Sequence, residues 1–337
     1  METQVALETN SKPKKSKKSL AVIIISAIIL ILVVLTFLVS SFLFKFAIKR
    51  SDGFDSLPPL TKLSYEDELV LEANLEELHK DRDDMLSGQG LEEVKISSFD
   101  GAILSADLIS QKDNPSHNWA ICVHGYRCDR REGEEFGTFY NKLGYNVLCP
   151  DLRGHGKSEG DYIGAGWLDR KDLISWISYI ISRDKDAKII LHGLSMGASS
   201  VLMACGDEEL PSNVVLAVSD CAYTSAWEIF SKELRESYHL PSFPIMNVAS
   251  GICKSKAGYS FKEASALNQV KSSRVPILFI HGDADDFVPY EMGERLYNAC
   301  SSEKDFFVAK NAGHAQAYKL YKDEYFKRVE EFISRYI

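Results

Sequence analysis

The 337-residue sequence lacks the cysteine patterns that mark a structural zinc site or a disulfide-stapled fold. Its seven cysteines include no C-x-x-C pair, and several fall in strand-like or helix-like runs that predict buried free thiols. A phosphate-binding loop is also absent, because the glycines of residues 151–160 do not stand at Walker spacing ahead of a helix. These absences argue against zinc-finger, disulfide-framework and P-loop classes, and we expect neither a metal nor a cofactor.

Positive charge is scarce outside the N-terminal region. Residues 1–50 carry eight Lys or Arg and two Glu, a net charge of +6, whereas the whole chain carries −9, so the remainder carries −15. An acidic body argues against nucleic-acid binding and makes anionic polymers poor substrates. No internal repeat is visible, and the residues after position 91 are numerous enough for one well-buried domain.

The most informative motif is the pentapeptide Gly-Leu-Ser-Met-Gly at 193–197. It follows the apolar run Ile189–Leu191, which predicts a buried strand, and precedes Ala198–Cys205, which predicts a packed helix. A serine on a sharp strand-to-helix turn, with glycines two residues to either side, is typical of a nucleophile elbow. Ser195 is therefore the candidate nucleophile.

An acid and a histidine follow the serine in chain order. The strand-like run Pro276–Ile280 leads into three carboxylates, Asp283, Asp285 and Asp286, just past the predicted strand end. After another strand-like run, His314 stands in a predicted loop before the C-terminal helix. A serine hydroxyl needs an imidazole to take its proton, and the imidazole needs a carboxylate to hold one tautomer. Spacing alone does not choose among the three carboxylates.

With these motifs, residues Leu91–Ile337 resemble an α/β-hydrolase, and specifically the membrane-anchored serine esterase-like members found in bacteria. The His-Gly-x-x-Asp-x-x-Val-Pro pattern of that family matches residues 281–289 without a gap, so the resemblance favours Asp285 as the acid. It implies an α/β fold, with a mostly parallel central sheet covered by helices on both faces. Alternating strand-like and helix-like runs along the chain agree with that fold.

An oxyanion needs two backbone N–H donors. Met196, the residue after the nucleophile, is expected to supply one. Residues 119–126 predict a strand that ends in His-Gly-Tyr, and the resemblance places the second donor on Tyr126. Three histidines next to a glycine at strand ends are expected to be structural: His124, His192 and His281.

Residues 222–268 interrupt the alternation and are rich in aromatic side chains. They predict a helical cap insertion over the carboxyl ends of the strands, where it would shape substrate specificity. The alternative is a set of helices that pack on the core without touching substrate.

The N-terminal region predicts membrane attachment. Leu20–Phe44 contains 25 residues without a charge, and about 20 suffice to span a bilayer core, so we expect a transmembrane helix. A cleaved signal peptide is disfavoured because the apolar run is long and no small-x-small site closes it. Five lysines within the basic tail 1–19 outnumber Lys45, Lys49 and Arg50, which predicts a cytoplasmic N-terminus in a single-pass cell-membrane protein whose catalytic domain is extracellular.

The organisation we expect is a tail at 1–19, a membrane helix at 20–44, a linker at 45–90 and a hydrolase domain at 91–337. Within the linker, the acidic stretch Tyr65–Asp84 predicts an amphipathic helix, with a solvated spacer as the alternative.

Together these features predict a membrane-anchored serine hydrolase that cleaves a small-molecule carboxylic ester through Ser195, His314 and Asp285. The bilayer is the other predicted partner, through residues 20–44, and no motif indicates a protein partner. Three alternatives stay open: a prolyl-oligopeptidase-like peptidase, an acyltransferase on the same site, and a binding protein that keeps only the fold.

Overall fold

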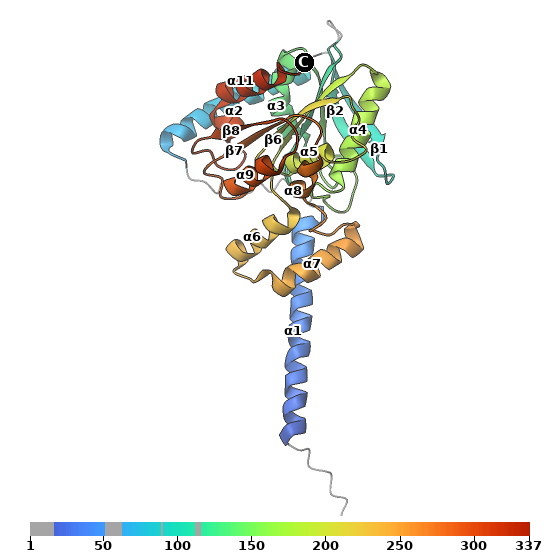
Figure 1. Cartoon of the computed structure of the whole chain (residues 1–337), viewed down its shortest axis with the longest axis vertical. Coiled ribbons are helices and arrows are strands. Elements are labelled where there is room, and N and C mark those ends of the chain that lie inside the picture. Colours follow the sequence, from blue (N-terminus) through green and yellow to red (C-terminus); the bar gives the residue numbers. More distant parts are fainter. Residues whose placement is uncertain (1–16, 51–62, 89, 112–115) are drawn as a thin grey trace, which may run out of the picture.

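The computed structural model describes residues 17–50, 63–88, 90–111 and 116–337, and within them the body is built on one eight-stranded sheet (Figure 1). The strand order is β1-β2-β4-β3-β5-β6-β7-β8. The first two strand pairs in this order are antiparallel and the other five are parallel. The strands are β1 (Leu91–Ser97), β2 (Ile103–Ile109), β3 (Asn118–Val123), β4 (Asn146–Pro150), β5 (Lys188–Leu194), β6 (Val214–Asp220), β7 (Ile277–Gly282) and β8 (Lys304–Ala309).

The helices form a layer on each face of the sheet. Buried side chains of α4, α5 and α9 belong to one apolar cluster, and those of α2, α3, α10 and α11 belong to the other. The predicted α/β-hydrolase architecture is therefore confirmed. The helices that form these layers are α2 (Tyr65–Ser87), α3 (Arg130–Lys142), α4 (Asp169–Arg183), α5 (Met196–Cys205), α9 (Tyr290–Ala299), α10 (Ala317–Leu320) and α11 (Lys322–Ile333).

The alternation of strand and helix begins only at β3. β1 and β2 form an antiparallel hairpin at one edge of the sheet, and the charged side chains of Glu92, Glu93 and Lys95 on β1 are exposed there. Such charges suit an edge strand, because they hinder pairing with another sheet. By contrast, β3 and β5 lie in the middle of the sheet and consist mostly of buried residues.

Helix α2 is docked on the body. Leu78 and Met85 are buried on its inner side, and the Nδ2 of Asn74 donates to the carbonyl oxygen of Lys319 at 2.8 Å. The Ser64 side chain caps the helix by accepting from the amide N–H of Asp67 at 3.1 Å. In the described residues this stretch is therefore a packed amphipathic helix.

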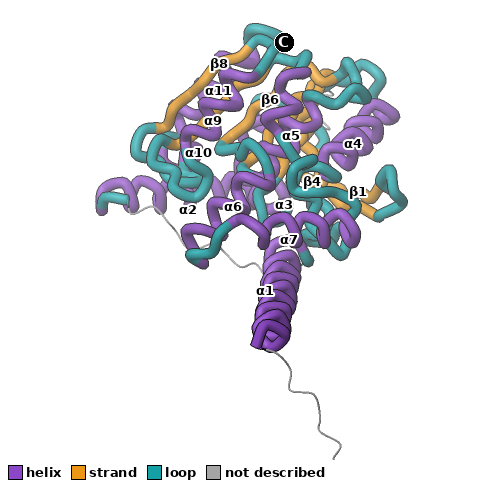
Figure 2. Tube along the Cα trace, turned by 60° about the horizontal axis from the view of Figure 1, so that its bottom comes forward, coloured by secondary structure: helices purple, strands orange, loops and turns teal. Residues whose placement is uncertain are grey.

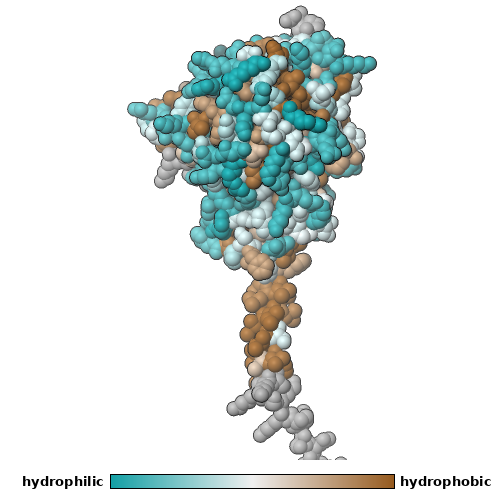
Figure 3. All heavy atoms as spheres, in the orientation of Figure 1, coloured by the Kyte–Doolittle hydropathy of each residue, from teal (hydrophilic) through white to brown (hydrophobic). Residues whose placement is uncertain are grey.

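The first described helix, α1 (Lys17–Ile48), contains an apolar stretch, Leu20–Ile48, that is long enough to cross a membrane. Most of it projects from the body as an apolar rod (Figure 3). Its last two turns, however, are part of the body: Phe44 and Ile48 are buried in the apolar cluster that also holds α4 and α5. The backbone continues this attachment, since the amide N–H of Ile163 donates to the carbonyl oxygen of Ile48 at 2.7 Å.

Two helices flank α1 where it leaves the body: α6 (Ala226–Tyr238) and α7 (Ser242–Ala257) (Figures 1 and 2). The short α8 (Ala266–Gln269) and a 3-10 turn (Val270–Ser272) lead back to β7. The hydroxyl of Ser40 on α1 donates to the carbonyl oxygen of Ile245 on α7 at 2.9 Å. Helices α6 and α7 fall within residues 222–268, where a cap was expected, whereas α8 and the 3-10 turn extend past that range.

We expect Phe44→Ala to lower the free energy of unfolding by about 3 to 5 kcal/mol, as for other buried Phe to Ala changes. Phe44 is 2% exposed, whereas Phe42, on the same helix, is 60% exposed. Phe42→Ala is thus the matched control, with an expected loss below about 1 kcal/mol. Urea unfolding of the full chain in detergent micelles measures both. Equal losses would contradict the packing of α1 into the body.

Candidate active site

The turn between β5 and α5 holds Ser195 in a strained backbone conformation, with φ of 55° and ψ of −114°. Its amide N–H donates to the carbonyl oxygen of Asp220 on the neighbouring strand at 2.8 Å, which fixes the corner. The flanking glycines are needed for space. A Cβ at Gly193 would lie 2.4 Å from the carbonyl carbon of Gly197, and a Cβ at Gly197 would lie 2.2 Å from the carbonyl oxygen of Val123. The local sequence therefore folds as the predicted elbow geometry requires.

The three predicted catalytic side chains meet above this corner. The Nε2 of His314 lies 2.8 Å from the Oγ of Ser195, and its Nδ1 lies 2.8 Å from the Oδ2 of Asp285. The other oxygen of Asp285, Oδ1, accepts the amide N–H groups of Phe287 at 3.1 Å and Val288 at 2.8 Å. Backbone amides thus hold Oδ1 of the carboxylate, while Oδ2 faces His314 and also lies 3.4 Å from the Nε2 of His281.

The two neighbouring carboxylates point elsewhere. Asp283 and Asp286 are exposed, and the Oδ1 of Asp283 accepts the amide N–H of Asn311 at 2.5 Å. Of the three carboxylates that follow β7, the structure brings Asp285 to the histidine.

The electrostatics of His314 and Asp285 suit proton transfer. Burial alone would lower the pKa of His314, but the negative charge and the hydrogen bond of Asp285 outweigh it and raise the pKa above the ordinary value. Burial alone would raise the pKa of Asp285, but the charge of His314 and hydrogen bonds from His281 and His314 lower it well below its usual range. Asp285 is therefore ionised beside an imidazole of increased basicity.

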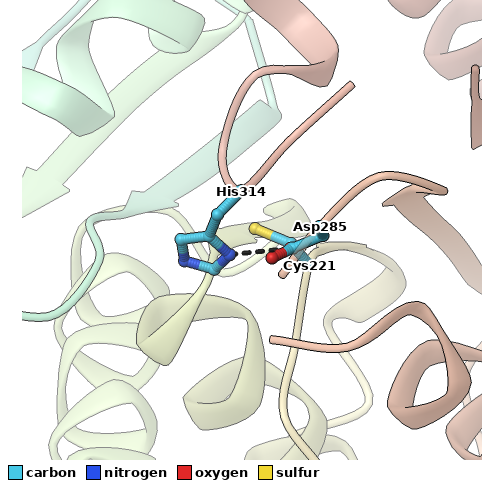
Figure 4. A group of neighbouring side chains, drawn as sticks. All are labelled: Cys221, Asp285 and His314. Carbon is cyan, nitrogen blue, oxygen red and sulfur yellow. Dashed lines mark hydrogen bonds and ion pairs between the residues drawn. The ribbon is translucent and has the colours of Figure 1, made fainter. Parts of the chain in front are cut away.

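A thiol lies beside this pair. In Figure 4 the ring of His314 points at Asp285, with Cys221 next to both, and one ligand atom from each residue lies within 4.8 Å of the others. Three such groups could in principle hold a cation. The nitrogen and oxygen that a cation would need already bond each other, and the group fits a hydrogen-bonded acid–base pair better.

A second carboxyl group, Asp220, lies buried at the carboxyl end of β6. Within the described residues neither of its oxygens has a hydrogen-bond partner. Burial raises its pKa to about 7, an effect that the nearby His281, the phenol of Tyr325 and His314 only partly offset.

This carboxyl group predicts a pH-dependent stability. The pKa of Asp220 is higher in the folded chain than in the unfolded chain, so both are protonated below about pH 4 and the free energy of unfolding has its full value there. As pH rises from 4 towards 7, the unfolded chain ionises at this group first, and the free energy of unfolding falls. We expect Asp220→Asn to remove this pH dependence. The midpoint of thermal unfolding of the variant minus that of the wild type should therefore be more positive at pH 8 than at pH 4. A difference independent of pH would contradict the assignment.

The two residues expected to supply oxyanion donors, Met196 and Tyr126, line the same cavity as Ser195. Met196 begins α5, so its N–H is one of the first four in a helix, which have no partner within the helix. Tyr126 follows Gly125, whose own N–H donates to Glu132 Oε2 at 2.6 Å. The phenol of Tyr126 donates to the carbonyl oxygen of Ala47 at 2.8 Å. The loop after β3 is thus joined to the end of α1, a contact that the sequence did not reveal.

The other histidines of the strand ends are structural. The ring of His124 has Nδ1 2.7 Å from the carbonyl oxygen of Gly125, and its Nε2 accepts the amide N–H of Leu152 at 3.0 Å. His192 bridges the phenols of Tyr140 and Tyr325 at 3.0 and 2.9 Å. His281 donates to the carbonyl oxygen of Val288 at 2.8 Å.

A cavity of about 280 Å³ opens beside Ser195 and is lined mostly by apolar side chains. Its walls come from α1, the loop after β3, α6 and α7, together with Phe261 and Phe287. The lining includes Leu43, Phe44, Phe46 and Ala47 of α1, Phe230, Leu234, Ser237 and Tyr238 of α6, and Met246 and Ala249 of α7. The end of the apolar helix is therefore one wall of the site, which periodicity in the sequence could not show.

The chain is similar to proteins of a known family. A model of the prolyl oligopeptidase family matches residues 136–337, more than half of the chain. The chain belongs to this family. It is 31% identical over 239 residues to YqkD, an uncharacterised protein of Bacillus subtilis, covering 71% of this chain and 77% of that protein.

Two solved structures are similar to this member of the prolyl oligopeptidase family. The esterase Pf2001 of Pyrococcus furiosus aligns with a TM-score of 0.58 at 26% identity, over 73% of this chain and 92% of its own. The acylaminoacyl peptidase of Pyrococcus horikoshii aligns with a TM-score of 0.55 at 16% identity, over 73% of this chain and 41% of its own. The second likeness is one of fold alone. The family and the fold make the chain a serine hydrolase.

Proposed function

We propose that this serine hydrolase cleaves carboxylic esters, with Ser195 as nucleophile, His314 as general base and acid, and Asp285 as the orienting carboxylate. The observation that carries the proposal is the continuous chain of hydrogen bonds from Ser195 through His314 to Asp285, at 2.8 Å each. Because the imidazole of His314 bonds to Asp285 through Nδ1, its Nε2 is the nitrogen that faces the hydroxyl.

In the first half of the reaction, the Oγ of Ser195 attacks the ester carbonyl carbon while His314 Nε2 takes the hydroxyl proton. The carbonyl oxygen becomes an oxyanion, for which the N–H groups of Met196 and Tyr126 are the proposed donors. When the carbon–oxygen bond to the alcohol breaks, the same proton passes from His314 to the leaving oxygen. An acyl group then remains on Ser195.

In the second half, water attacks the acyl carbon and gives a proton to His314 Nε2. Collapse of the second tetrahedral intermediate breaks the bond to Ser195, whose oxygen recovers the proton. The acid product leaves and the enzyme returns to its starting state. An alcohol in place of water would make the same site an acyltransferase.

Esters are favoured over peptides by two observations. The cavity beside Ser195, to which α1, α6 and α7 contribute walls, is lined mostly by apolar groups. Of the two structural neighbours, the esterase matches over nearly its whole length. The peptidase reading rests on the family description and on the fold of the acylaminoacyl peptidase.

The experiment that tests this choice compares the p-nitrophenyl ester of N-acetylalanine with the p-nitroanilide of the same acyl group, using the full chain in detergent micelles. We expect this chain to cleave the ester. We expect it to cleave the anilide at least about a hundredfold more slowly than a known serine peptidase cleaves the same anilide. Cleavage of the anilide at the peptidase's own rate would overturn the ester assignment.

The proposed base predicts the pH dependence. Hydrolysis requires neutral His314, so kcat/KM should fall about tenfold per pH unit on the acid side of its pKa. Because Asp285 raises that pKa, the midpoint lies above the ordinary histidine value of 6.5. Asp285→Asn should move the midpoint to lower pH. A profile flat between pH 5 and 8 would contradict the assignment of His314.

We also propose that residues 20–44 anchor the chain in the cell membrane, between a tail at 1–19 and a linker at 45–90 that leads to the domain at 91–337. A cleaved signal is disfavoured because the end of α1 is buried in the body and lines the cavity. The lysine bias supports an orientation with the body outside the cell. Protease treatment of intact cells tests this orientation, since a body that stays protected would reverse it.

A further inference from the structure

We propose that the substrate is a single-chain glycerol ester of the bilayer, and that its acyl chain enters the cavity sideways between α1 and α6. The proposal rests on the ester hydrolysis proposed above and names its substrate class. It follows from the depth at which the cavity meets the membrane, from the residues at its mouth and from the character of its walls.

The cavity lies at the level of the lipid headgroups. The apolar stretch of α1, Leu20–Ile48, has 29 residues, whereas about 20 cross the hydrocarbon core. The last two turns of α1 therefore extend beyond the core, and the exposed Lys45 and Lys49 suit a position among headgroups. Leu43, Phe46 and Ala47 in these turns line the cavity.

Two aromatic residues mark the mouth, because each lines the cavity and is also exposed. Phe46 on α1 is 48% exposed and Tyr238 on α6 is 41% exposed. Phe243, at the start of α7, is 76% exposed. Figure 1 places α6 and α7 around α1 directly where it leaves the body. Exposed aromatic side chains at this level are typical of proteins that rest on the bilayer interface.

The walls fit one acyl chain. The volume of about 280 Å³ is close to the lower end of the roughly 300–1,000 Å³ of ligand pockets, which suits one chain better than two. The apolar lining offers a hydrocarbon chain the same environment as the bilayer. At the mouth, Glu233 and Ser237 also line the cavity, and the Ser237 hydroxyl lies 3.3 Å from the Glu233 carboxylate. Such polar groups suit the hydroxyls of a glycerol headgroup.

The test uses the full chain in phosphatidylcholine vesicles that contain 1-monopalmitoylglycerol, with p-nitrophenyl butyrate as the soluble comparison. We expect palmitate release from the monoglyceride and little from the two-chain phosphatidylcholine. Butyrate cleavage without palmitate release from the monoglyceride would overturn the proposal. Cleavage of neither ester, with no labelling by a fluorophosphonate, would instead refute the proposed hydrolase function.

A substitution at the mouth tests the route. Ser237→Trp narrows the gap between α1 and α6, so we expect the ratio of palmitate to butyrate release to fall at least about tenfold. Ser178→Trp makes the same change at an exposed serine of α4, which does not line the cavity, and should leave the ratio unchanged. An unchanged ratio in Ser237→Trp would rule out lateral entry.

A second measurement needs no substitution. A hexadecyl fluorophosphonate with a diazirine at the end of its chain would phosphonylate the Oγ of Ser195 with loss of fluoride and, on illumination, mark the residues beside the chain. We expect adducts on α1 residues 43–47 or on α6. Adducts confined to other elements would contradict the route.

Discussion

Ser195→Ala should lower kcat for p-nitrophenyl butyrate by about 10⁴ to 10⁶-fold, because removing the nucleophile of a triad removes the whole covalent route. Binding should change little, since the cavity is lined mostly by side chains of other elements. The residual rate would come from the oxyanion donors and from binding alone. Steady-state hydrolysis by the full chain in detergent micelles measures the loss.

The control for this substitution is Ser178→Ala. Ser178 is an exposed serine on α4 whose hydroxyl donates to the carbonyl oxygen of Ile174 at 2.9 Å. Its rate should equal that of the parent. If Ser195→Ala kept more than about a hundredth of the activity, a different nucleophile would be required.

Asp285→Asn has the second largest expected effect, a loss in kcat of about 10⁴-fold with the fold intact. The amide oxygen of Asn can still accept the N–H groups of Phe287 and Val288, which now bond Oδ1. The amide NH₂ then faces Nδ1 of His314 in place of Oδ2. That nitrogen must become the acceptor, so Nε2 carries the proton and cannot take one from Ser195.

Asp286→Asn is the matched control, because it makes the same change at the next residue, which is exposed. It should keep the parent rate within about threefold. Thermal unfolding of both variants separates a loss of catalysis from a loss of folding. A large fall in Asp286→Asn with a small one in Asp285→Asn would reverse the assignment.

The elbow and the chain order of the three side chains could be predicted because they depend on short-range chemistry. Gly193 and Gly197 are needed where backbones nearly touch, and that need is visible as a motif. The choice of Asp285 required a family pattern. Its physical cause, the pair of amides at Phe287 and Val288 that hold the carboxylate, becomes visible only in three dimensions. The catalytic roles themselves stay predictions.

Long-range contacts could not be predicted from the sequence. The apolar run at Leu20 indicates a membrane helix, but nothing in its periodicity reveals that Phe44 packs in the core or that Ala47 accepts the phenol of Tyr126. The β1–β2 hairpin was likewise missed, since its exposed edge residues weaken the strand pattern. A chain cut at residue 50 would lose one wall of the cavity.

The most direct measurement of the central claim is labelling of the full chain with a fluorophosphonate, followed by mass spectrometry of the modified peptide. We predict one adduct per chain, on Ser195, with labelling slowed strongly in Asp285→Asn and unchanged in Asp286→Asn. Absence of an adduct, or an adduct on another serine, would contradict a serine hydrolase built on Ser195, His314 and Asp285.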